Sequence, residues 1–421
     1  MSSSSRNVVA ATRLLAAAIG CVLAQSALAA VDGYVIPEAD VGAEHHTNID
    51  VRPSGGDVDS EVDGYSGGLG ATLGLRSPRG LTEVRPRIDY SRYPDRSELS
   101  DPNYYLDLKS TYGFQRDKLK LIGHYSRENS VQAETPEAGF DTFDPNNPLQ
   151  NTGSRILLQS QTTTRTQLRP EYVHDFTERV GAGVGGIYQI VKFDSDGQTT
   201  RRDNDYLQGE GFLTWKLDQR TDLRTGLYSS KFKTDDDTNR TDGNGVNLML
   251  TRSWSPSLSG FIQANGERTE VETRAAAAGS PTTTEKSNSW GFTVGGYRLT
   301  PVSTTYLSVG RLLTPSSSGV RAEVDEVHVE YNRNLSERLI ATTAFRGSRS
   351  RAQGGDTSAN GADDDDNDDF VGEVGMRYLI TRTWYIAGGY SYVWQRFKSD
   401  DTSGHDNVFR IRFGYFGLPP Q

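Results

Sequence analysis

Segment 383–396 constrains the fold of this chain more than any other stretch. Ten residues of β-strand tilted by about 40° rise roughly 25 Å, which is the height of the apolar band on an outer-membrane barrel. Trp and Tyr near the two ends of such a strand mark the boundaries between lipid and water. A strand of a soluble sandwich is usually half this length. The segment is therefore predicted to span a membrane as a β-strand. Read with period two, one of its faces carries Trp384, Ile386, Gly388, Tyr390, Tyr392 and Trp394.

Alternation of the same kind recurs about every twenty residues to the end of the chain. It predicts an all-β fold: a transmembrane antiparallel up-and-down β-barrel of about 16–18 strands, with 18 favoured. The predicted aromatic girdle of this barrel consists of Trp384, Tyr392, Trp394 and Tyr415. The predicted strands are 35–46, 64–76, 81–93, 103–115, 118–129, 160–174, 178–193, 204–216, 220–233, 244–254, 257–271, 286–299, 303–313, 320–333, 337–349, 369–380, 383–396 and 405–416.

Short and long connections alternate between these strands. Short periplasmic turns and long external loops are the arrangement of outer-membrane barrels, and an even number of strands returns both ends of the barrel to the periplasmic side. One connection, 314–319, is short where a long loop is due. The predicted long connections are 47–63, 94–102, 130–159, 194–203, 234–243, 272–285, 350–368 and 397–404.

Charged residues fall on one face of the predicted strands, and the opposite face is apolar. Charges restricted to one face of a strand of this length belong in a wet lumen. The cations on this face modestly outnumber the acids counted with them, which predicts a preference for anions. The alternative is that each cation pairs with an acid on a neighbouring strand. The predicted lumen cations are Arg85, Arg87, Lys109, Arg165, Arg169, Arg224, Arg346, Arg377, Arg410 and Arg412, and the acids are Asp89, Asp107, Glu171, Glu210, Glu326, Glu330 and Glu373.

The beginning of the chain has the form of a secretory signal. A basic start, an apolar run and an A-x-A motif at 27–29 predict a signal peptide over 1–29 that is cleaved. A short periplasmic lead over 30–34, the barrel over 35–416 and a C-terminal tail over 417–421 follow. The single cysteine, Cys21, lies in the signal, so disulfides and cysteine metal sites are excluded from the mature chain. The mean hydropathy of −0.61 fits a barrel, because only alternate residues face lipid.

No motif of a known catalytic site or bound cofactor occurs in the sequence, and no metal site is predicted. His45 and His46 beside Glu44 form a rim cluster, but adjacent strand residues point to opposite faces. A net charge of −10 gives no support for nucleic-acid binding. The first strand follows the signal closely, which disfavours a plug domain. The expectation is a protein that is not an enzyme.

Two features of the predicted loops bear on function. The acids gather there, as in 363–366 and 235–237, and are interpreted as solvated loop, with divalent-ion bridging to surface lipid or polysaccharide as the sharper alternative. The longest loop, 130–159, contains aromatic residues and prolines and is a candidate constriction that folds into the pore.

The chain resembles the outer-membrane β-barrel porins found with bacterial exopolysaccharide and capsule genes. The resemblance rests on 46–50 after the first strand, on 90–93 before a polar loop, and on 125–128 at a strand end. It implies a Gram-negative outer-membrane location and a role in the passage of polysaccharide. The expected partners are polysaccharide or oligosaccharide, outer-membrane lipid and lipopolysaccharide, the barrel-assembly machinery and periplasmic polysaccharide-secretion proteins. The chain departs from most such barrels in continuing past Phe416 instead of ending on an aromatic residue.

The function expected from these observations is an outer-membrane channel for exopolysaccharide or its oligosaccharides, in which lumen arginines set the charge preference. Three alternatives stay open. They are a general or solute-specific uptake porin, a closed structural or adhesion barrel that acts through its acidic loops, and a hydrolase or acyltransferase at the barrel rim.

Overall fold

A computed structural model describes most of the chain. The described residues are 32–49, 51, 60–129, 162–194, 203–235, 239–274, 282–315, 321–353, 366–398 and 401–418. The signal peptide predicted over 1–29 and the loop 130–159 lie outside them.

Eighteen strands and one short 3-10 helix, η1 (Ser97–Leu99), make up the described structure. The strands are β1 (Asp32–His46), β2 (Val62–Ser77), β3 (Gly80–Arg92), β4 (Pro102–Gly113), β5 (Asp117–Asn129), β6 (Thr162–Asp175), β7 (Val180–Asp194), β8 (Asn204–Lys216), β9 (Thr221–Thr234), β10 (Asn239–Ser255), β11 (Leu258–Arg274), β12 (Thr282–Thr300), β13 (Ser303–Pro315), β14 (Arg321–Asn334), β15 (Leu339–Gln353), β16 (Asn367–Leu379), β17 (Trp384–Phe397) and β18 (Thr402–Phe416).

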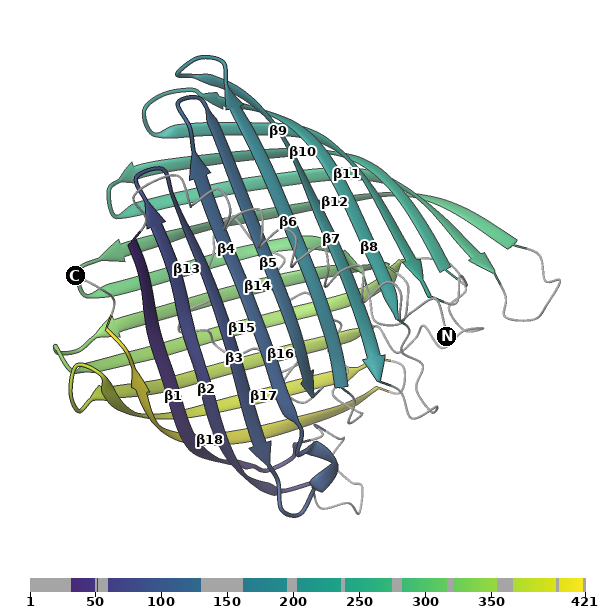
Figure 1. Cartoon of the computed structure of the whole chain (residues 1–421). Helices are drawn as coiled ribbons and strands as arrows, with labels where there is room; N and C mark the ends of the chain where they lie inside the picture. Colours follow the sequence, from purple (N-terminus) through teal and green to yellow (C-terminus); the bar gives the residue numbers. More distant parts are fainter. Residues whose placement is uncertain are drawn as a thin grey trace, which may run out of the picture.

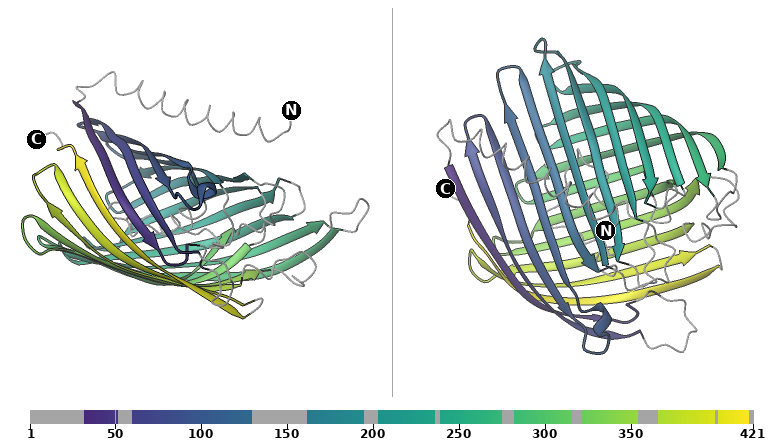
Figure 2. Two further views of the ribbon diagram at one scale, coloured as in Figure 1. Left: turned by 90° about the horizontal axis from the view of Figure 1, so that it is seen from below. Right: turned by 45° about the vertical axis from the view of Figure 1, so that its right-hand side comes forward.

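The strands form one closed antiparallel barrel. Each strand pairs with its neighbours in the sequence, and β1 pairs with β18 to close the wall. Figure 1 shows this closure as the purple β1 beside the yellow β18, and the two views in Figure 2 show a single sheet curved upon itself. The predicted all-β barrel of 18 strands is confirmed.

The two ends of the barrel differ in the length of their connections. One end carries turns of two to four residues at 78–79, 114–116, 176–179, 217–220, 256–257, 301–302, 335–338 and 380–383. The other end carries most of the longer connections, as the sequence predicts for the external side. Two predicted long connections there are wrong, since 235–238 and 398–401 have only four residues each.

Hydroxyl groups stabilise several of the short turns. In each case a Ser or Thr oxygen near the start of the turn accepts a hydrogen bond from the backbone N–H three residues later, which is why these residues favour turns. The acceptors are Thr177, Thr300, Ser336 and Thr381, at 2.9–3.1 Å from the donor nitrogen. Asp218 has the same role in the β8–β9 turn, and its bonds from the Arg220 N–H and the Thr221 hydroxyl lower the pKa of its carboxyl.

The outer surface of the wall is apolar. Large apolar side chains at alternate positions of most strands are exposed, among them Leu69 at 63%, Leu227 at 68% and Ile411 at 54%. A soluble protein rarely exposes a contiguous apolar surface of this size, and a barrel in lipid requires one. The protein is therefore an outer-membrane β-barrel. No helix among the described residues is long and apolar enough to cross a membrane.

Several strands extend further toward the external side than the sequence predicts. β10 begins at Asn239 instead of 244, β12 at Thr282 instead of 286, and β18 at Thr402 instead of 405. Backbone pairing continues there beyond the apolar band, where both faces are polar and the alternation that predicts a strand is lost. At the other end of the wall, β1 begins at Asp32, inside the predicted lead 30–34.

Candidate functional site: the inner wall and its closing seam

All ten predicted lumen cations lie on the inner face of the wall. The register places each of them at positions that alternate with exposed apolar residues, as Arg410 and Arg412 alternate with Phe409, Ile411 and Phe413. The acids predicted with them lie on the same face, since directly opposite pairs such as Arg85 and Asp107 point the same way. The barrel interior therefore collects the charges of nearly every sector of the wall.

The first cluster of inner charges lies on β1 and β3. Arg85 donates to both carboxylate oxygens of Glu38, at 3.2 and 2.9 Å. Arg87 lies 2.8 Å from Asp40 and 2.8 Å from Asp89. Two arginines thus share three carboxylates here, so their charges are compensated.

The second cluster is centred on Arg224 of β9. Its guanidinium lies 2.7 Å from Glu171, contacts Glu210 and stacks on the Phe212 ring at 3.5 Å. Asn247 donates to the other oxygen of Glu210 at 2.9 Å. One cation here faces two acids, which leaves an excess of negative charge.

The remaining inner cations differ from one another in their partners. Arg346 binds Glu326 at 2.6 Å, and Arg377 lies over the Tyr385 ring at 4.8 Å. Within the described part of the chain, Lys109 and Arg165 show no ion pair, while Arg169 and Arg412 do interact with neighbours.

The predicted excess of positive charge in the lumen is not found. Eight inner-facing acids have no signal in the sequence of their own strand that pairs them with the lumen cations. They are Glu38, Asp40, Glu44, Glu83, Glu128, Glu267, Asp369 and Asp406. With these eight, the acids named on the described inner face number fifteen against the ten predicted cations, so acids outnumber cations there.

A second sector of the inner wall is almost neutral. Over the middle of β10–β13 most inward side chains carry hydroxyl or amide groups, with Met249 and Phe261 as apolar neighbours and Glu267 as the acid among them. Such groups both donate and accept hydrogen bonds without attracting one sign of charge. The members are Thr241, Asn247, Gln263, Asn265, Thr269, Ser287, Ser289, Thr293 and Ser308.

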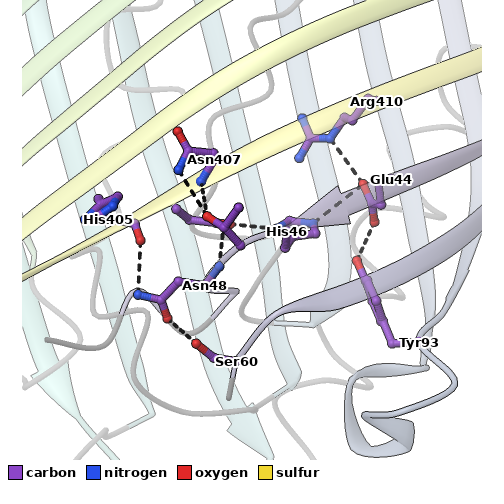
Figure 3. Close-up of polar contacts among 10 residues, drawn as sticks. Glu44, His46, Asn48, Ser60, Tyr93, His405, Asn407 and Arg410 are labelled. Carbon is purple, nitrogen blue, oxygen red and sulfur yellow. Dashed lines mark hydrogen bonds and ion pairs between the residues drawn. The ribbon is translucent and has the colours of Figure 1, made fainter. Parts of the chain in front are cut away.

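A buried polar network closes the seam between β1 and β18 at the external end (Figure 3). His46 Nδ1 lies 2.7 Å from Asp406 Oδ2, and Arg410 Nε donates to Glu44 at 3.1 Å. The Tyr93 hydroxyl donates a hydrogen bond to the Glu44 carboxylate at 2.5 Å. Burial and the Glu44 carboxylate raise the pKa of Tyr93 well above its usual range, so the hydroxyl keeps its proton. We call these five residues the seam cluster.

The segment after β1 folds over the inside of this seam. Asn48 binds Asp406 through its backbone N–H at 2.8 Å. Ile49 packs with Val62, Tyr93 and Leu99 on one side, and Val51 packs with Val371 and Val393 on the other. Val51 has a φ of 49°, a conformation that β-branched residues rarely adopt. The described part of the first external loop thus turns into the barrel, whereas the predicted constriction at 130–159 lies outside the described residues.

The two rim histidines separate as their positions in a strand require. His46 points inward to Asp406, and His45 points outward to Asp63 at 2.9 Å, with 37% of its side chain exposed. The described residues contain no group of three or more side chains arranged to hold a metal ion.

The predicted girdle residues all face outward on β17 and β18. Trp384 stacks on Phe413 and contacts Tyr415 at the turn end, with ring centroids 5.2 and 5.0 Å apart. At the loop end Tyr392 lies 6.1 Å from Phe370, and Trp394 pairs with Phe370 across the strands.

Comparison with known proteins gives similar solved structures only. No protein-family model matches the chain, and no curated protein matches it. The outer membrane channel DcaP of Acinetobacter baumannii is 13% identical over 92% of this chain and 97% of that chain, with a TM-score of 0.45. Pseudomonas aeruginosa OccK2 (OpdF) in complex with glucuronate is 11% identical over 92% and 99%, with a TM-score of 0.44. The copper transporter OprC is 12% identical with a TM-score of 0.44, and the match covers 87% of this chain and 62% of OprC.

Proposed function

We propose that the protein is an outer-membrane channel for carbohydrate, with exopolysaccharide or its oligosaccharides as the solute. The observation that carries the proposal is the division of the inner wall. One sector holds paired charges, and β10–β13 present hydroxyl and amide groups. A barrel of 16–18 strands leaves an aqueous channel, and a wall of this kind offers hydrogen bonds to sugar hydroxyls along its length.

The charges of the inner wall favour a neutral carbohydrate over an anionic one. Arg85, Arg87 and Arg346 each bind carboxylates on the wall, and Arg224 is outnumbered by its two acids. Paired guanidinium groups still donate hydrogen bonds but do not create the ring of fixed positive charge that selects anions. The role of the lumen arginines in this proposal is therefore to keep the wall wet and hydrogen-bonding.

The same wall supports an uptake porin for small hydrophilic solutes as the second candidate. The two functions differ in the size of the solute that enters the pore. A polysaccharide channel must hold several sugar units at once, whereas an uptake porin needs to bind only one.

Single-channel conductance of the refolded mature protein in a planar bilayer tests the proposal. Neutral and anionic oligosaccharides of increasing length are added to each side in turn. Steady currents with block that strengthens with the length of a neutral oligosaccharide support the carbohydrate channel. Currents that respond to monosaccharides alone favour the uptake porin, and the absence of current from folded protein indicates a closed structural barrel.

A variant of the neutral sector sharpens the test. Replacing both Gln263 and Asn265 by Leu removes two amides from the inner face of β11 without changing its charge. Weaker oligosaccharide block with unchanged ion selectivity is expected. Unchanged block would show that this sector does not contact the solute.

A further inference from the structure

A row of charged residues crosses the outer surface of the barrel at its external end. The register places Arg311 opposite Asp325, Asp325 opposite Arg349, and Arg349 opposite Asp368. Asp368 in turn lies opposite Arg396, so the row runs without interruption over β13–β17. All five positions share the outward face, because the arginines and acids of the lumen occupy the alternate positions.

Ion pairs hold the row together and recruit neighbouring side chains. Arg311 binds both oxygens of Asp325, at 2.6 and 3.0 Å, and Arg349 lies 2.7 Å from Asp368. Further contacts come from Glu323, Arg351, Lys398 and Asp401, at distances between 2.5 and 4.0 Å. We call these nine residues the outer charged strip.

The strip lies directly above the apolar band. Two residues further into the membrane, roughly 7 Å along each strand, the register reads Val309, Val327, Gly347, Phe370 and Trp394. Phe370 at this level, with Phe345 and Tyr392 one step deeper, forms an aromatic row with ring centroids 4.9 and 6.1 Å apart. Interfacial aromatic residues mark the boundary of the hydrocarbon, so the strip lies at the depth of the lipid headgroups.

The guanidinium groups of the strip are only partly used by the acids. A guanidinium has five N–H donors, and the contact of Arg349 with Asp368 uses two. The side chains of Arg349, Arg351 and Arg396 are 51%, 46% and 47% exposed on the lipid-facing surface. The strip has five cations and four acids in a chain whose net charge is −10.

We infer that the outer charged strip binds the phosphorylated glycolipid of the outer leaflet, through the phosphates on its sugar headgroup. Arginine matches phosphate with paired N–H donors, and the aromatic row below offers a surface for the sugars and the first methylenes of the acyl chains. The acids of the strip hold the guanidinium groups in place and supply carboxylates for divalent ions that bridge to further phosphates. The inference rests on the outer-membrane location alone and does not depend on the channel function.

Native mass spectrometry of the full mature protein with bisphosphorylated lipid A tests this inference. The triple variant R311Q/R349Q/R396Q is expected to bind lipid A about tenfold more weakly, since charge-assisted hydrogen bonds to phosphate are lost. The matched control is R252Q/R298Q/R333Q, which removes three outward arginines at the turn end of the same wall. Heat-modifiable migration confirms that both variants are folded.

Weakened binding in the strip variant and unchanged binding in the control support the inference. Equal loss in both variants would show a general charge effect and overturn it, as would no loss in either. Phosphatidylglycerol that binds the wild type as tightly, with the same sensitivity to the strip variant, would also overturn it, because the strip would then recognise any lipid phosphate.

Discussion

His46 Nδ1 lies 2.7 Å from Asp406 Oδ2, and this hydrogen bond joins the first strand of the barrel to the last. Both side chains are almost fully buried. The β1–β18 ladder is the contact that closes the wall, and it forms only after the whole chain has been placed. A buried, charge-assisted bond at its external end therefore helps to fix the register of closure.

Replacement of His46 by Ala is expected to destabilise the barrel by about 2 kcal/mol, because the buried Asp406 keeps the bond from the Asn48 N–H to Oδ1 but loses its partner at Oδ2. The matched control is His45→Ala, one residue away on the outward face, where an exposed contact with Asp63 is worth about 0.5 kcal/mol at most. Urea unfolding in lipid vesicles measures both changes. Equal stability of the two variants would contradict a role for the seam cluster in closure.

The inward segment at Ile49 and Val51 predicts a second outcome. If this segment narrows the external mouth, the double variant I49S/V51S releases its apolar contacts with both sides of the seam and raises the single-channel conductance. Deletion of 136–152 tests the loop that the sequence suggested instead. A rise with the deletion and none with the double variant would assign the constriction to the longer loop.

The balance of charge around Arg224 predicts a change in ion selectivity. Arg224→Gln leaves Glu171 and Glu210 facing the lumen without their shared cation, so the reversal potential in a KCl gradient is expected to shift toward cation preference. Adding Glu210→Gln removes one of the two acids and is expected to return the potential close to that of the wild type. A reversal potential that does not move in either variant would place this cluster away from the ion path.

The sequence predicts the barrel well because lipid and water act on alternate residues of each strand. Segment 383–396 shows both the apolar face and the girdle, and the short turns carry their own Ser, Thr and Asp signals. The sequence no longer predicts strands where this alternation of apolar and polar residues ends. The strands β10 and β12 continue past the apolar band, and the outward row from Arg311 to Arg396 lies in the part of the strands where both faces are polar.

Contacts between distant strands have no local signal at all. His46 and Asp406 are 360 residues apart, and only closure of the wall brings them together. The same holds for the ion pairs between the acids of β1 and the arginines of β3. Glu38 and Asp40 reach Arg85 and Arg87 across the small residues of β2, a relationship that no single strand displays.

The end of the last strand predicts where the assembly signal lies. Tyr415 contacts Trp384 on the outer surface, Phe416 N–H donates to Thr383 O at 2.9 Å, and Gly417 N–H donates to Pro37 O at 2.7 Å. Removal of 418–421 is therefore expected to leave assembly intact, since ladder pairing ends at Phe416 and the last of these backbone bonds at Gly417.

The double variant Y415A/F416A is expected to lower the amount of heat-modifiable barrel in outer-membrane fractions. Phe413→Ala is the control, because it removes a stacked aromatic from the same strand without touching its end. Equal levels of the double variant and the wild type would contradict the prediction, and an equal loss in the control would assign the effect to packing instead of to the terminal signal.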